Sequence, residues 1–153
     1  MKIRAPLPGR PGPDRQRGLA AVEFALVAAL FFAILIGTME MGRVLFYWNS
    51  AAEATRLGAR VAVVCDLDDA EIKARMRTML SILPSDKITI LYKPAGCDVN
   101  TCDSVTVSIL ANVSVATFIP YVPLSLTLPP FSTTLPRESM LSTVKGEANP
   151  VCM

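Results

Sequence analysis

The chain has 153 residues, a net charge of +2 and an apolar content of 52%, which leaves room for one small domain and a membrane segment. It contains no histidine, so the commonest general base and metal ligand is missing. Beyond residue 18 the charge balance is mildly acidic, which argues against nucleic acid as a partner.

Residues 1–18 form a basic leader rich in proline and glycine. Five of its side chains are basic and one is acidic, and a basic segment before an apolar span predicts a cytoplasmic N-terminus. Because proline disfavours a regular helix, we expect none in this segment. The leader either remains as a cytoplasmic tail or is removed after Gly18.

An apolar run follows from Leu19 to Met39, and Glu23 is its only charged residue. As a helix, this run would be roughly 31 Å long, about the thickness of the hydrocarbon core of a bilayer. We therefore expect a transmembrane segment over residues 19–42, with Glu40 and Arg43 at its exit to water. An ionised carboxylate at the centre of such a helix costs about 2.5–3.5 kcal/mol, so Glu23 calls for a specific role.

The helix is expected to continue to about residue 64, because no proline interrupts it. Four polar residues recur at helical spacing and would form one stripe: Asn49, Glu53, Arg56 and Arg60. Small residues lie around this stripe: Ala51, Ala52, Ala54, Gly58, Ala59 and Ala62. This pattern predicts an amphipathic helix whose small-residue face lets another backbone or sheet approach closely.

A second helix is expected over residues 68–83. Asp68 and Glu71 have the spacing of a capping box, and Pro84 would end the helix. Its apolar residues share one face: Ile72, Met76, Met79, Leu80 and Leu83. Its basic residues lie largely elsewhere, as a solvated face or as a surface for a partner.

Beyond Pro84 the apolar period changes to two, which is typical of half-buried strands. We expect strands at about 87–93, 104–117 and 131–142, with a long hairpin tip over 94–103 and a loop over 118–130. On the second strand, alternate residues would be buried: Val105, Val107, Ile109, Ala111, Val113 and Val115. The fold class is α+β, with a long N-terminal helix, a second short helix and a small antiparallel sheet of about three strands. Residues 43–153 would form an extracytoplasmic head with an irregular tail.

All four cysteines lie beyond the span, so they would be in an oxidising compartment, where disulfides form. Cys97 and Cys102 are close enough in sequence to close the hairpin tip, and they are the first candidate bridge. Cys65 and Cys152 are the second. We expect no free reactive thiol.

Chemistry-bearing motifs are missing from the sequence. It has no glycine-rich phosphate loop, no metal-binding cluster and no histidine to activate a serine or cysteine. The acidic group Asp66, Asp68 and Asp69 lacks the glycine and glutamate of a calcium-binding loop, so a helix start is the simpler interpretation. We therefore expect no enzyme activity, no metal and no cofactor.

The stretch Gly18-Leu19-Ala20-Ala21-Val22-Glu23-Phe24-Ala25-Leu26 resembles the processing site and N-terminal helix of type IV pilin-like proteins. Residues 21–26 and 53–60 resemble, more particularly, the TadE-like family of minor pilins or pseudopilins of tight-adherence systems. The resemblance implies cleavage between Gly18 and Leu19, with Phe24 in the processing motif. Glu23 would then be the fifth residue of the mature chain and the carboxylate used in assembly.

The resemblance also implies a function. The chain would be a minor pilin or pseudopilin that assists assembly of thin adhesive tight-adherence (Flp) pili. Its partners would be the membrane, a prepilin peptidase, other pilin or pseudopilin subunits and the pilus assembly machinery. It would be a single-pass protein of the bacterial inner membrane with a periplasmic head, or a part of the pilus itself. An uncleaved membrane-anchored periplasmic structural or binding protein, and a pseudopilin of a type II-like secretion machine, are the alternatives.

Overall fold

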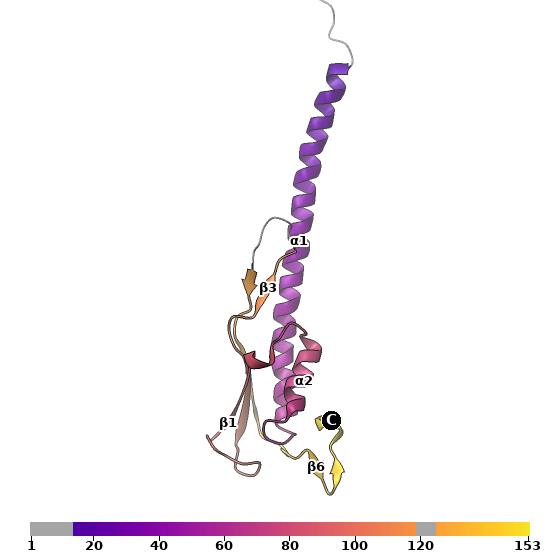
Figure 1. Ribbon diagram of the computed structural model, residues 1–153. Helices are drawn as coiled ribbons and strands as arrows, with labels where there is room; N and C mark the ends of the chain where they lie inside the picture. Colours follow the sequence, from indigo (N-terminus) through magenta and orange to yellow (C-terminus); the bar gives the residue numbers. More distant parts are fainter. Residues whose placement is uncertain (1–13, 119–124) are drawn as a thin grey trace, which may run out of the picture. The chain divides into compact units, whose positions relative to one another are not determined.

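The computed structural model describes residues 14–118 and 125–153, with side chains from residue 18 onward (Figure 1). The chain divides into two compact units, one ending at Met39 and one beginning at Glu40. Helix α1 (Asp14–Ala62) contributes to both units, and the second unit adds a short helix and antiparallel strands. This is the α+β fold that the sequence predicts.

Helix α1 begins earlier than expected. The prediction that residues 1–18 contain no regular helix is wrong for residues 14–18, which are helical. The last proline of the leader is Pro13, so nothing beyond it prevents helix formation. The leader's prolines themselves lie outside the described residues.

The principal sheet has three antiparallel strands in the order β1 (Ile88–Lys93), β2 (Ser104–Ile109) and β5 (Phe131–Pro136). A short 3-10 helix, η1 (Ser85–Lys87), precedes β1. Along the central strand β2, the buried residues alternate with partly exposed serines and threonine. This alternation follows the period of two in the sequence, and it directs one face of the sheet toward α1.

The predicted strand over 104–117 is broken in two. The backbone at Asn112 has φ 75°, a left-handed conformation that asparagine tolerates better than most residues. Beyond this point β3 (Ser114–Ala116) pairs with β4 (Ser125–Thr127) instead of with the main sheet. Ala111, predicted to be buried, is therefore exposed, and the predicted loop contains a strand; residues 119–124 of that loop lie outside the described residues.

The C-terminal segment is more regular than expected. Strand β5 ends at Pro136, because proline has no N–H to continue the ladder, so the predicted strand over 131–142 is too long. Lys145 and Gly146 both have positive φ, as in the tight turns that join hairpin strands. The elements that follow β5 are β6 (Thr143–Val144), β7 (Glu147–Ala148) and the 3-10 helix η2 (Pro150–Cys152).

Helix α2 (Ala70–Met79) is shorter than the predicted 68–83, and a different residue caps it. The carboxylate of Asp69, not of Asp68, accepts a hydrogen bond from the N–H of Glu71 at 2.9 Å. Asp68 has φ 55° and belongs to the turn before the helix. Leu80 and Leu83 lie past the helix end, yet both are buried.

The core of the second unit forms on the small-residue face of α1. Four alanines of this face are fully buried: Ala51, Ala54, Ala59 and Ala62. The polar stripe predicted on the same helix is exposed. Gly58 faces both α2 and the sheet, because a Cβ atom added there would lie 2.5 Å from Met76 Sδ and 3.2 Å from Val107 Cγ1. The amphipathic half of the helix therefore packs as predicted.

Among the described residues, the one buried polar side chain of this core belongs to Thr55. Its hydroxyl donates to the carbonyl of Ala52 at 2.8 Å and lies 3.0 Å from the hydroxyl of Thr133 on β5. A buried hydroxyl without partners would destabilise the fold, whereas this one ties α1 to the sheet.

We expect Gly58→Val to lower the free energy of unfolding of the second unit by about 1–3 kcal/mol, because the side chain overpacks a filled core. Gly42→Val is the matched control, since a Cβ at Gly42 meets nothing within 4 Å. Denaturant unfolding of each variant in detergent, followed by near-ultraviolet circular dichroism, measures its free energy of unfolding. Equal midpoints for the two variants would contradict this packing.

Candidate functional site

The predicted processing residues lie near the start of α1 and are open to the surroundings. Leu19 is 72% and Phe24 is 74% exposed. A Cβ atom added at Gly18 would meet nothing within 4 Å. The described residues therefore give no steric reason for a glycine at this position, although glycine weakens a helix by about 1 kcal/mol relative to alanine.

Glu23 lies one helical turn beyond Leu19 on α1, and its side chain is exposed. Among the side chains that the structure describes, none forms an ion pair or hydrogen bond with it. An apolar environment would make an unpaired carboxylate costly. Its role as an assembly carboxylate stays a prediction.

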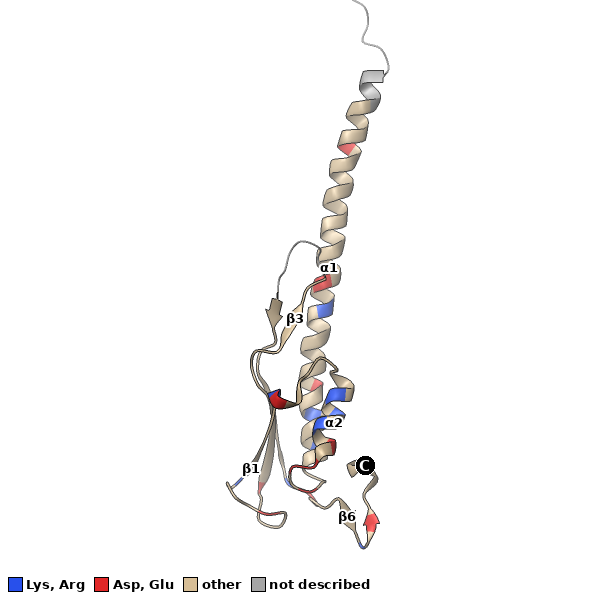
Figure 2. Cartoon of the chain, viewed as in Figure 1, with Lys and Arg blue, Asp and Glu red and all other residues tan. Residues whose placement is uncertain are grey.

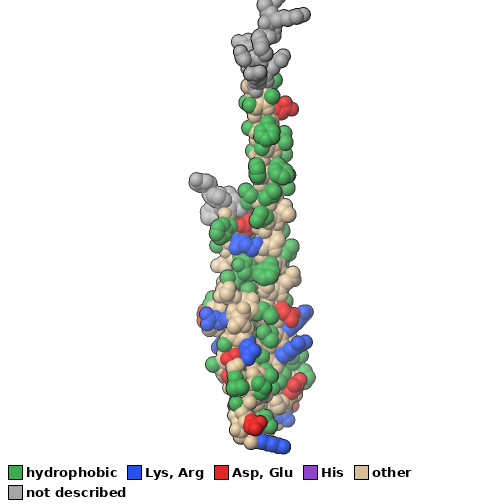
Figure 3. Space-filling view, turned by 90° about the vertical axis from the view of Figure 1, so that its right-hand side faces the viewer, with side chains coloured by type: hydrophobic (Ala, Val, Ile, Leu, Met, Phe, Trp, Pro, Cys, Tyr) green, Lys and Arg blue, Asp and Glu red, His purple; other side chains and the backbone are tan. Residues whose placement is uncertain are grey.

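The apolar side chains that follow Glu23 are not covered by the rest of the described chain. Leu26, Phe31, Phe32 and Ile34 are each between 57% and 69% exposed, and hydrophobic side chains cover much of this segment in Figure 3. By length and composition, α1 is the candidate membrane span of the described residues. The hydroxyl of Thr38 donates to the carbonyl of Ile34 at 2.8 Å, so it needs no partner outside the helix.

Glu40 and Arg43 follow this apolar segment and belong to the second unit. The Arg43 guanidinium donates to the Glu40 carboxylate at 2.9 Å and to the carbonyl of Ala116. The other Glu40 oxygen accepts from the N–H of Phe118 at 2.6 Å. The sequence indicated an exit to water at this pair, but it gave no sign that the pair holds the end of β3.

Figure 2 shows where the charged residues lie. They are sparse along the N-terminal part of α1 that is not drawn in grey, and they are numerous on the helices and loops of the second unit. The described side chains of the first unit, residues 18–39, are thus suited to an apolar environment and those of the second unit to water.

The four cysteines form two disulfides, Cys65–Cys152 and Cys97–Cys102. Both pairs are the candidate bridges of the sequence. The first joins the segment after α1 to the last residues of the chain, and the second closes a short loop between β1 and β2. No cysteine is free.

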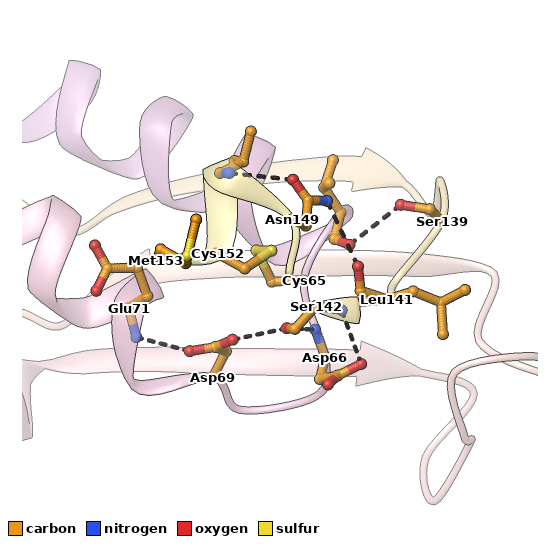
Figure 4. The surroundings of a disulfide bond; sticks show 12 residues. Cys65, Asp66, Asp69, Glu71, Ser139, Leu141, Ser142, Asn149, Cys152 and Met153 are labelled. Atoms are coloured by element: carbon orange, nitrogen blue, oxygen red, sulfur yellow. Dashed lines mark hydrogen bonds between the residues drawn. A yellow bond between two sulfur atoms is a disulfide. The ribbon is translucent and has the colours of Figure 1, made fainter. Parts of the chain in front are cut away.

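Hydrogen bonds reinforce the Cys65–Cys152 bridge (Figure 4). The Ser142 hydroxyl donates to Asp69 Oδ2 at 2.8 Å and accepts from the N–H of Asp66 at 2.9 Å. Asp69, Cys65 and Cys152 also offer potential metal ligands within 4.8 Å of one another. Because both sulfurs are in the disulfide, they do not supply the thiolates that bind metals, and the arrangement is structural.

The loop closed by Cys97 and Cys102 is ordered around Asp98. Its carboxylate accepts from the N–H of Asn100 at 2.8 Å, and from the N–H and hydroxyl of Thr101 at 2.9 and 3.0 Å. The Asn100 N–H, and after it the Thr101 hydroxyl, lower the pKa of Asp98 below its ordinary value. These bonds favour the ionised form.

Thr101→Val should raise the pKa of Asp98 toward its ordinary value, because it removes one donor to the carboxylate. A lowered pKa in the folded state means that the stabilisation is present at neutral pH and is lost as pH falls through that pKa. The variant's deficit in stability should therefore shrink in acid. Carbon-detected NMR titration measures the pKa, with exposed Thr143→Val as the control, and an unchanged Asp98 pKa in Thr101→Val would contradict the assignment.

The comparisons with known proteins concern helix α1. Residues 18–60 match the family model described as TadE-like protein. No curated protein and no solved structure matches the chain. The match begins at Gly18 and includes both segments whose resemblance the sequence indicated. The resemblance is thereby confirmed: residues 18–60 of the chain are similar to TadE-like proteins.

Proposed function

We propose that this chain is a minor pilin or pseudopilin that assists assembly of tight-adherence pili. The observation that carries the proposal is the TadE-like match over residues 18–60, which falls on an exposed apolar helix with one carboxylate shortly after a glycine. The match and the helix fit a single-pass membrane protein associated with such pili. The TadE-like family is one of structural proteins, and we propose no catalytic role.

Processing would take place between Gly18 and Leu19. The position of Gly18 at the start of the TadE-like match supports this, and the described residues leave the space around it open. A residue without a side chain allows close approach of the backbone to a protease cleft. The products would be the leader and a mature chain that begins with a free α-amino group at Leu19.

Glu23 would pair with the α-amino group of a neighbouring subunit. One carboxylate without a partner in a lipid environment is costly, and pairing with an opposite charge in low dielectric offsets part of that cost. Subunits that dock in register would satisfy both charges. The exposure of Glu23 and its lack of a described partner support this role.

The second unit would be the periplasmic head of this subunit. Its two disulfides support an oxidising compartment, where such bonds persist. The basic leader before the span supports a cytoplasmic N-terminus. Prepilin peptidase and the other pilin or pseudopilin subunits are the partners that follow from this placement.

We expect the native protein to begin at Leu19, and Gly18→Val to leave the full-length form. Gly37→Val is the matched control, because Gly37 is also on α1 and a Cβ there meets nothing within 4 Å. N-terminal sequencing and intact mass of the protein from cells that contain the peptidase distinguish the forms. A wild-type chain that begins at Met1 would instead favour the uncleaved membrane anchor.

Glu23→Gln should insert in the membrane and remain folded, yet fail to support pilus assembly, because it keeps the shape and loses the charge. Glu23→Ala should fail in the same way. Glu53→Gln is the control, since Glu53 is an exposed residue of α1 whose partner is Arg56 in the same helix. Pilus counts by electron microscopy and membrane fractionation are the readouts. Normal piliation with Glu23→Gln would mean that the carboxylate only reaches the nearby membrane interface.

A further inference from the structure

Phe118 is a large apolar side chain held in an exposed position. It is 86% exposed, more than the other large hydrophobic residues that the structure describes. Single exposed apolar residues are common on protein surfaces, so the exposure of Phe118 alone does not indicate a binding surface. The contacts that fix the position of Phe118 are the stronger evidence.

Three contacts hold Phe118 next to the first residues of the second unit. Its N–H donates to Glu40 Oε1 at 2.6 Å, and Arg43 donates to the carbonyl of Ala116, two residues before it. The Arg43 Cζ atom also lies 5.9 Å from the centre of the Phe118 ring and 5.8 Å from that of Tyr47. Phe118, Arg43 and Tyr47 thus form one cluster, here called the aromatic–arginine cluster.

The position of this cluster along α1 coincides with the expected end of the membrane span. No charged residue lies between Glu23 and Glu40, and the ion pair of Glu40 and Arg43 ends this uncharged run. Exposed apolar side chains, among them Phe46 and Trp48, continue beyond the ion pair, as aromatic residues do at a membrane interface. Ionised side chains avoid the hydrocarbon core, whereas arginine and tyrosine are favoured at the level of the lipid headgroups. The headgroup layer would therefore lie at the cluster.

We propose that the ring of Phe118 inserts into the interfacial layer of the phospholipid bilayer, as a second lipid contact of the chain besides α1. This rests on the proposed membrane anchoring. Arg43, which contacts the ring, follows the apolar run of α1 closely in the sequence, and this favours lipid as the occupant. Because Glu40 and Arg43 tie Phe118 to the helix, the contact would fix the orientation of the periplasmic head above the membrane before assembly.

Fluorescence of a single tryptophan in the full chain, reconstituted in phospholipid vesicles, tests the proposal. The chain has one tryptophan, so Trp48→Phe provides a silent background. Phe118→Trp then places the reporter at the cluster, and Leu91→Trp places a control reporter on β1, where Leu91 is 52% exposed. Brominated phospholipids report contact with lipid, and acrylamide reports contact with water.

We expect brominated lipid to quench the reporter at 118 strongly and acrylamide to quench it weakly, with the opposite result at 91. Glu40→Ala in the 118 background should reduce the lipid quenching, because the N–H of Phe118 loses its acceptor. Acrylamide quenching at 118 equal to that at 91 would overturn the inference, and so would protection from both quenchers, which would mean that protein covers the ring.

Flotation of the same vesicles separates this inference from the proposed function. If the chain floats with the vesicles while the reporter at 118 stays accessible to water, the membrane anchor stands and the Phe118 contact is wrong. If the chain does not float, the membrane-anchored function itself is wrong, and the inference falls with it.

Discussion

The close contact of α1 with α2 and the central strand β2 is the interaction on which the second unit depends. It is possible because the buried face of α1 carries alanines and Gly58, whose missing Cβ leaves room for Met76 and Val107. Larger side chains on that face would separate the layers and expose the apolar side of the sheet. The hydroxyl pair of Thr55 and Thr133 adds a polar contact at a fixed position in the same core.

A second constraint is that α1 meets two environments. Up to Met39 its apolar side chains are exposed within the described structure, which suits an apolar environment. From Glu40 onward the helix carries a buried small-residue face and an exposed polar stripe, and exposed apolar residues such as Phe46 lie before the stripe. The change occurs at the Glu40–Arg43 ion pair, which also binds the end of β3, so the point where the environment changes is also a point of tertiary contact.

Covalent bonds add to the packing of the second unit. Its two disulfides stabilise the fold mainly by constraining the unfolded chain. Cys65–Cys152 fastens the C-terminal segment to the turn after α1, where Ser142 binds both Asp66 and Asp69. These groups belong to the scaffold, whereas the residues proposed for processing and assembly lie on the exposed part of α1. Substitutions in the processing and assembly residues should therefore leave the fold of the second unit largely intact.

The sequence by itself determined the features that depend on neighbours along the chain, such as the apolar span, the small-residue face of α1, the alternation along β2 and the TadE-like segment at 18–60. It did not determine the break at Asn112, the cap at Asp69 or the contact between Glu40 and Phe118. The first two depend on how the chain must turn to bury its next apolar residues. The third joins residues 78 positions apart, and only the tertiary structure decides which distant backbone groups reach a given carboxylate.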